Sequence, residues 1–301
     1  MKTETDIRDH RLHKFDSGNE YYQVQPNSNM LDKTEANVEL CARTNFLCLS
    51  DFNDRKILKH LYCTATFLCL YMVSWILIFP SSWITGHSDI HYAYYHKVMK
   101  LMNLTKIPPQ FVTKYAGHTL VQFTHNLPGA LWAGAIPFQL NPDVRRKYPR
   151  LHKVTGYLFL GTSFLMSYGI IVILARQLTF LHDFPINVAT ENFNFEFWCV
   201  NLSVISLTCW FVFTAFTAIS KIRSRDYQSH RNFIVRHIGS GIWVALQRII
   251  FGMCNIAGLS ESPHEIKYSF KAAACAGVVI SVLTSEFVIH LLKRQEFALK
   301  Q

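Results

Sequence analysis

Three polar side chains that could bind a ligand or exchange a proton lie in an apolar stretch at residues 116–138. His118, Gln122 and His125 follow one another at i, i+4 and i+7, so a helix would place all three on one face. His125 lies near the middle of the stretch, at a depth where ionisable groups are unfavourable in a bilayer and usually functional. We therefore take these residues as candidates for a functional site.

A second group of polar side chains lies in the stretch at residues 233–256. It contains Arg236, His237 and Arg248. Imidazole can ligate a metal or exchange a proton near neutral pH, and arginine at membrane depth should face protein or water and find an acceptor. These three residues are candidates for binding a cofactor or a substrate.

Glu286 is an acidic residue that should lie at the same membrane depth as part of this second group. A helix rise of about 1.5 Å per residue places it, within the stretch at residues 269–292, at the depth of Arg236 and His237. We predict an ion pair between Glu286 and Arg236. The pair would either hold two helices together or take part in proton or ion movement.

The chain that carries these residues has the composition of a membrane protein. Half of its 301 residues are hydrophobic and 17% are charged, whereas soluble domains average about 25% charged residues. Lipid admits only helices or closed barrels, and the apolar stretches are too long for barrel strands. We predict an all-α polytopic membrane helix bundle with about six transmembrane helices, at about 60–80, 116–138, 154–175, 197–220, 233–256 and 269–292.

The net charge of +10 is distributed as in an oriented membrane protein. Arginine and lysine gather at residues 139–153, at 221–232 and in the C-terminal tail, whereas 176–196 and 257–268 carry one such residue each. Basic loops stay in the cytoplasm, so the N- and C-termini are predicted to be cytoplasmic. This distribution indicates the lipid bilayer as a partner, and no nucleic acid.

The predicted domain organisation follows from the same patterns. Residues 1–50 are polar and mixed in charge, which predicts a disordered cytoplasmic segment. Residues 51–294 would form the transmembrane domain, and 295–301 a short tail. The loop at residues 81–115 contains a glycosylation sequon at Asn103, in agreement with its predicted place outside.

Several short motifs recur in order between residues 118 and 250, and together they resemble an uncharacterised multi-pass membrane family (domain of unknown function 2306). They are His125-Asn-Leu-Pro-Gly129, Pro137-Phe-Gln139, Arg145, His152-Lys-Val-Thr-Gly156, His230-Arg231, Arg236 and Arg248. The chain departs from the family pattern at Lys153 and at His237. The resemblance implies a helical membrane core. A more distant likeness is to haem-binding membrane electron carriers of the cytochrome b561 type.

The first functional hypothesis is a membrane carrier of electrons that binds haem b. Haem b needs one or two neutral imidazoles, small residues beside the ring, and cations near its propionates. His125 and His237 could supply the imidazoles, although helix rise places them at depths of roughly 20 and 10 Å. The other candidate cofactor-binding residues are Gly129 and Gly241 beside the ring, Arg236 and Arg248 at the propionates, and His152, His230 and Gln139.

Three alternatives stay open. A transporter or proton-coupled carrier would line a midplane cavity with His125, Gln122, Arg248 and Glu286. A membrane enzyme would use a histidine cluster with a metal, or hydrolytic chemistry, with His152, His230 and His290 converging on the cytoplasmic rim. The enzyme class that fits the haem hypothesis is a membrane oxidoreductase. A scaffold would use the same polar residues for helix packing alone. The cysteines have no metal-binding spacing, so no metal is expected beyond a haem iron.

Overall fold

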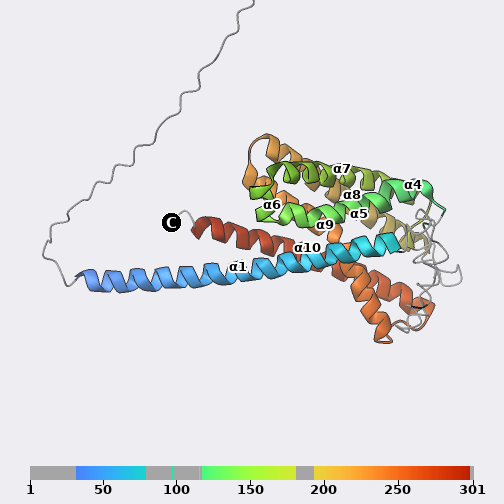
Figure 1. Cartoon of the computed structure of the whole chain (residues 1–301). Coiled ribbons are helices and arrows are strands. Elements are labelled where there is room, and N and C mark those ends of the chain that lie inside the picture. The colour runs from blue at the N-terminus through green and yellow to red at the C-terminus, as the bar shows by residue number, and fades with distance from the viewer. Residues whose placement is uncertain (1–31, 79–96, 98–114, 116, 181–192, 299–301) are drawn as a thin grey trace, which may run out of the picture. The chain divides into compact units, whose positions relative to one another are not determined.

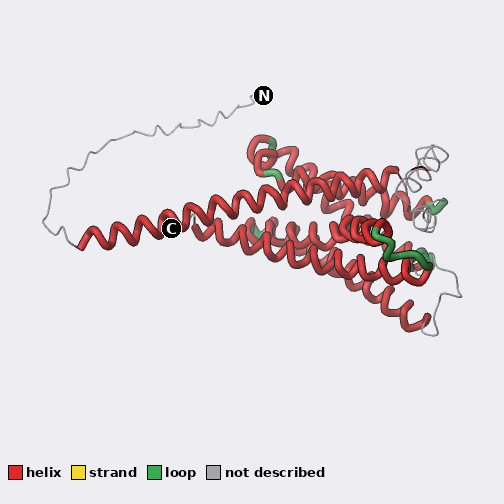
Figure 2. The backbone as a smooth tube through the Cα atoms, turned by 90° about the horizontal axis from the view of Figure 1, so that it is seen from below, coloured by secondary structure: helices red, strands yellow, loops and turns green. Residues whose placement is uncertain are grey.

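The computed structural model describes residues 32–78, 97, 115, 117–180 and 193–298, and their side chains from Asp54 onward except at 193–197 and 298 (Figure 1). The described residues form helices joined by turns and contain no strand, as Figure 2 shows. The chain divides into two compact units, Met1–Cys48 and Leu49–Gln301. All side-chain contacts below lie within the second unit.

Helix α1 spans Asp32–Ile78 and begins inside the segment for which we expected disorder. Residues 32–53 contain neither proline nor glycine, so no residue there strongly opposes a helix that continues outward from the apolar part. The expectation of disorder at residues 1–31 falls outside the described residues. The predicted sequon at Asn103 does so as well.

The second predicted span forms an interrupted helix composed of α4 (Thr119–Val121), the π-helical turn η1 (Gln122–Asn126) and α5 (Leu127–Leu140). Pro128 has no N–H to donate to the Thr124 carbonyl, and the turn before it widens, so that the Leu127 N–H bonds to the Gln122 oxygen. Gly169 of the helix opposite makes room for this turn. A Cβ atom there would lie 2.8 Å from the Thr124 carbonyl oxygen.

The remaining helices are α6 (Pro142–Lys147), α7 (Pro149–Ala175), α8 (Phe193–Arg223), α9 (Tyr227–Ile256) and α10 (Pro263–Ala298). Prolines occupy the first turns of α6 and α7, where the missing N–H leaves no helical bond unmade. Asn141 caps α6 and Asp226 caps α9 with side-chain oxygens that accept backbone N–H bonds.

Among the described residues, four helices are long and apolar enough to cross a membrane. They cover Asp54–Ile78, Pro149–Ala175, Trp198–Arg223 and Pro263–Phe297, which confirms four of the predicted spans. The protein is therefore a multi-pass integral membrane protein. The other two predicted spans are helical but are not among these four, since one is interrupted at η1 and the 30-residue α9 carries Arg231, Arg236 and Arg248.

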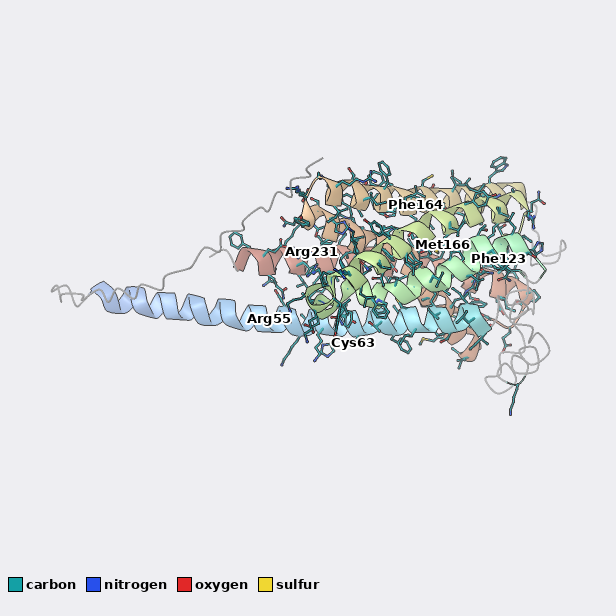
Figure 3. All side chains as sticks on the ribbon, turned by 45° about the horizontal axis from the view of Figure 1, so that its top comes forward. Arg55, Cys63, Phe123, Phe164, Met166 and Arg231 are labelled. Atoms are coloured by element: carbon teal, nitrogen blue, oxygen red, sulfur yellow. The ribbon has the colours of Figure 1, made fainter. Side chains whose placement is uncertain are left out.

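Buried apolar side chains from five helices form the main core. Trp132 of α5, Phe159 of α7 and Phe211 of α8 are almost inaccessible, and Cys69 of α1 and Ile242 of α9 join them. Helices α5 and α7 pack together, as do α8 and α9, and α9 also packs along α10. Figure 3 shows Arg55 and Arg231 toward one end of this bundle and Phe123 toward the other.

Candidate functional site

His237 is fully buried and both of its ring nitrogens are hydrogen-bonded. Nδ1 lies 3.1 Å from the Phe211 carbonyl oxygen and 3.0 Å from the Thr214 hydroxyl. A carbonyl only accepts, so Nδ1 carries the proton. The Trp132 indole N–H then donates to Nε2 at 3.3 Å, and the Ser163 hydroxyl lies 2.8 Å from the same nitrogen. The lone pair of this imidazole is therefore already used.

Aromatic rings enclose the same imidazole. The His237 ring lies 4.3 Å from that of Phe211 and 5.2 Å from that of Phe159, measured between centroids. A Cβ atom on Gly241 would lie 2.5 Å from the Trp132 ring, so Trp132 fills the space that we expected a haem to use. The surroundings of His237 do not fit a haem ligand, and the pairing of His125 with His237 is not supported.

The first predicted group, His118, Gln122 and His125, lies at and just before the turn η1. Gln122 is fully buried; its amide N–H donates to the Tyr115 carbonyl at 3.0 Å, and its oxygen accepts from Asn126 at 2.9 Å. His125 Nδ1 lies 3.3 Å from the Met166 carbonyl, which leaves the lone pair on Nε2. The neighbouring His118 forms the start of α4, where its carbonyl accepts the backbone N–H of Gln122 at 3.1 Å.

A third cluster lies where α5 ends and where α7 and α9 begin. We call this the basic end, because Arg145, Arg146, Arg225 and Arg231 lie there. The Gln139 amide donates to the His152 carbonyl at 2.9 Å and to the Thr155 hydroxyl at 2.6 Å. A Cβ atom on Gly156 would lie 3.3 Å from the Gln139 oxygen. Gln139 thus fixes the end of α5 against the first turns of α7.

Two histidines lie at the basic end. His152 of α7 is partly buried, and its Nδ1 is buried without a hydrogen-bond partner among the described residues. His230 of α9 has Nδ1 2.8 Å from the Ala218 carbonyl oxygen, so Nδ1 carries the proton and Nε2 keeps its lone pair. His230 and Arg145 both lie close enough to His152 to act on it electrostatically.

The ion pair predicted between Arg236 and Glu286 is present. Arg236 Nε lies 2.6 Å from Glu286 Oε1, and its terminal Nη2 lies 2.9 Å from Oε2. The guanidinium also lies over the Phe233 ring, 5.3 Å from its centroid. This two-bond geometry is the strong form of an arginine–carboxylate pair, and it joins α9 to α10.

The other members of the predicted midplane cavity have separate partners. The Arg248 guanidinium lies 5.8 Å from the Trp75 ring centroid and 5.3 Å from that of Phe270. Gln122 and His125 contact the start of their own helix and α7, and Glu286 contacts Arg236. The structure therefore distributes these side chains over three places.

Ser163, Thr214 and Trp132 take part in the polar cluster around His237, and no sequence pattern indicates this. Each lies in an apolar stretch, where serine, threonine and tryptophan are common and have no distinctive spacing. Within the described parts of the chain, no three or more of the histidine, cysteine, aspartate and glutamate side chains gather as a metal site would require. His152, His230 and His290 do not converge in that way.

Comparisons with known protein families, with curated proteins and with solved structures found no match. The resemblance to an uncharacterised multi-pass family stays a prediction.

Proposed function

We propose that the protein is a six-span membrane protein that binds haem b through His152 and His230 and carries electrons. The observation that carries this proposal is the buried Nδ1 of His152, which has no hydrogen-bond partner among the described residues. A second imidazole, that of His230, acts on His152 electrostatically. Buried polar atoms in native proteins are nearly always bonded. An imidazole nitrogen left without a hydrogen bond keeps the capacity to bind iron, and two imidazoles can supply both protein ligands of a haem.

His230 supports the same assignment through its tautomer. Its Nδ1–H is held by the Ala218 carbonyl at 2.8 Å, so the lone pair on Nε2 has a fixed direction. Metal-binding histidines usually have this arrangement, in which a carbonyl or carboxylate orients the ring from behind. The Gln139 amide holds the backbone of His152 in place by donating a hydrogen bond to its carbonyl. When bound, the haem would supply one-electron transfer, and these residues would hold and orient it.

Six spans with cytoplasmic termini account for the charge distribution. Helix α9 has 30 residues, or about 45 Å at the usual rise, which is long enough to cross. Its charges at depth have partners, since Glu286 binds Arg236 and two aromatic rings flank Arg248. Tyr148, Tyr157 and Tyr227 at the basic end are 60–68% exposed, as expected for tyrosines at a membrane–water interface.

The test is an absorption spectrum of the full chain, purified in detergent after expression with a supply of haem. We expect a dithionite-reduced minus oxidised spectrum with a Soret band and sharp α and β bands. His152→Ala and His230→Ala should each abolish it. His290→Ala, which alters an exposed histidine of α10, is the matched control and should leave it intact.

Two results would overturn the proposal. A flat spectrum from well-folded, pure protein would remove the haem. A spectrum that survives both His152→Ala and His230→Ala but disappears in His125→Ala would place the haem at η1 instead.

A second candidate, a proton-coupled carrier, is favoured by the interruption of the second helix. Transporters place substrate and ion sites at discontinuous helices, and π-helical turns often mark functional sites. Here the turn η1 presents buried Gln122 and a His125 with a lone pair on Nε2. Proteoliposomes loaded with a pH-sensitive dye test it. Proton flux that His125→Gln abolishes, without loss of folding, supports the carrier, and no flux above empty vesicles excludes it.

A further inference from the structure

Helix α7 carries a continuous stripe of exposed side chains that begins with two cations. Successive helical residues point about 100° apart, so positions 150, 153, 154, 157, 161 and 164 fall on one face of this membrane-spanning helix, and all six residues are exposed. None of them belongs to the main core of the bundle. We call them the α7 stripe: Arg150, Lys153, Val154, Tyr157, Gly161 and Phe164.

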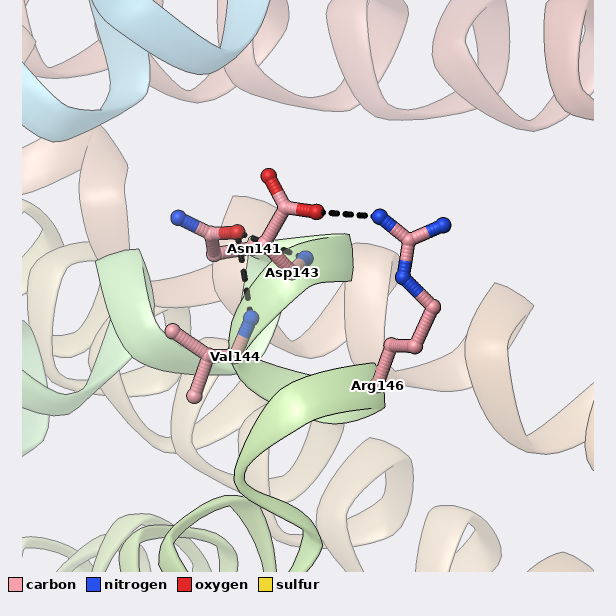
Figure 4. A network of polar contacts seen from close by, with 4 residues as sticks. All are labelled: Asn141, Asp143, Val144 and Arg146. Atoms are coloured by element: carbon pink, nitrogen blue, oxygen red, sulfur yellow. Dashed lines mark hydrogen bonds and ion pairs between the residues drawn. The ribbon is translucent and has the colours of Figure 1, made fainter.

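Several cations near the stripe are already paired with carboxylates. Arg146 binds Asp143, at 2.7 Å between Nη2 and Oδ1, on the short helix α6 that the Asn141 side chain caps (Figure 4). Two further ion pairs at the basic end are Lys221–Asp226 and Arg231–Glu296.

The two cations of the α7 stripe differ from these. Neither Arg150 nor Lys153 has a carboxylate partner within the described parts of the chain. Lys153 Nζ lies 5.9 Å from the centroid of the Tyr157 ring, within the range of a cation–π contact, which orients the ammonium group without neutralising its charge. The stripe therefore begins with two positive charges for which the described chain supplies no anion.

The apolar part of the stripe has the length of one membrane leaflet. A rise of about 1.5 Å per residue places Phe164 about 16 Å beyond Lys153, and half of a hydrocarbon core of about 30 Å is about 15 Å. Val154 is 64% exposed and Phe164 is 38% exposed. Apart from the backbone of its own helix, a Cβ atom on Gly161 would have no heavy atom within 4 Å. Open space therefore lies on this face, between the positions of Tyr157 and Phe164.

We propose that the α7 stripe binds an anionic phospholipid, with the headgroup at Arg150 and Lys153 and one acyl chain along Val154, Gly161 and Phe164. Charge complementarity identifies the headgroup, because basic residues at the end of a membrane span attract lipids with a net negative charge. The match to one leaflet and the open space beside Gly161 suit an acyl chain. This inference requires that α7 crosses the membrane and does not depend on the haem.

The experiment compares two lipids that differ in headgroup charge. Full-length protein in detergent is titrated with dioleoyl phosphatidylserine and with dioleoyl phosphatidylcholine, and native mass spectrometry gives the dissociation constant of the first lipid bound. Wild type should prefer phosphatidylserine, and each cation should contribute about fivefold to the ratio of the two constants. Arg150→Gln and Lys153→Gln should each lower the ratio by that factor. Arg146→Gln, which removes a cation already paired with Asp143, is the matched control and should leave the ratio unchanged.

A second pair of variants tests the place of the acyl chain. Gly161→Leu fills the open space on the stripe and should weaken the binding of phosphatidylserine. Gly252→Leu fills open space beside another glycine, on α9, and should leave binding unchanged. Thermal unfolding shows whether each variant is folded.

Three results would overturn the inference. Equal affinity of wild type for the two lipids would remove the headgroup site. A ratio that falls equally in Arg146→Gln and in Arg150→Gln would mean that only the overall charge of the basic end matters. A disulfide-linked dimer that forms in vesicles with Val154→Cys but not with wild type would make the stripe a contact between two copies of the chain. Lipid binding is measured without haem, so failure here leaves the proposed function untouched.

Discussion

The two histidines whose contacts differ most, His237 and His152, show how little depth alone says about function. His237 is the more deeply buried, yet both of its nitrogens are bonded and aromatic rings surround it. His152 lies near the end of the bundle and has a buried nitrogen with no hydrogen-bond partner in the described parts of the chain. Because ligand or proton chemistry needs a free lone pair or proton, we expect His237 to have a structural role.

His237→Leu should therefore reduce stability and leave intact the haem binding that we propose at His152 and His230. The change removes the hydrogen bonds that join α9 to Trp132, Ser163 and Thr214, and interhelical hydrogen bonds in membrane proteins contribute about 1–2 kcal/mol. Thermal unfolding in detergent measures the loss, and the reduced minus oxidised spectrum checks the haem. A spectrum lost without any fall in stability would make His237 a ligand after all.

One contact between the polar residues could be predicted from the sequence, whereas the partners of the others could not. The Arg236–Glu286 pair was predictable because depth alone brings the two side chains level. The pairing of His125 with His237 was not, because it depends on the rotation of each helix about its axis, which apolar stretches that are buried on all sides do not specify. The contacts of His237 with Ser163 and Thr214 depend on that same rotation.

At the scale of helices, α9 and α10 approach each other closely through small side chains. A Cβ atom on Gly239 would collide with the Ser285 hydroxyl, and one on Gly277 would lie 2.9 Å from the Trp243 carbonyl oxygen. Such small residues let helix backbones approach in membranes. The same interface carries the Arg236–Glu286 pair, so the spacing of the two helices also sets the geometry of that pair.

Gly239→Ala should destabilise the protein, and Ser285→Ala should restore part of the loss. Overpacking a close interface costs about 1–3 kcal/mol, and removing the Ser285 hydroxyl takes away the nearest obstructing atom. Thermal unfolding of both single variants and the double variant measures the coupling. Strictly additive effects would contradict a direct contact between these residues. Gly252→Ala, at a position with open space around it, is the matched control.

The cap of α9 gives a pH-dependent contribution with a defined sign. The backbone N–H of Ser229 lowers the pKa of the Asp226 carboxyl, and the nearby Lys221 adds to the effect. Because this pKa is lowered in the folded state, the ionised carboxyl stabilises the fold at pH values above the ordinary aspartate pKa of about 3.9. The contribution is lost as the pH falls from there through the lowered pKa. Unfolding temperatures of wild type and Asp226→Ala should therefore differ at about pH 7 and converge below about pH 4. A gap that widens on acidification would contradict the assignment.

The helices were predictable where the length of an apolar run determines them. They were less predictable where backbone hydrogen bonding determines their shape. Four spans were confirmed because a run of about 20 apolar residues is long enough to cross a membrane as a helix. The turn η1 depends on the missing N–H of Pro128 and on space beside Gly169, a contact between two helices that sequence periodicity does not contain. Helix α1 continues past its apolar part because nothing in residues 32–53 stops it.

At the scale of the whole molecule, the proposal of six spans depends on α9 crossing the membrane despite its charges. If it crosses, a reporter fused after Arg225 lies in the cytoplasm and one fused to a chain that ends at Ser260 lies outside. Fluorescent protein should then report the first and alkaline phosphatase the second, and a fluorescent protein after Gln301 should again be active. Activity of the same reporter at Arg225 and Ser260 would mean that α9 lies along the membrane surface. Arg236 would then no longer have the depth at which its pair with Glu286 was predicted, so this measurement tests the membrane frame in which that pair was predicted.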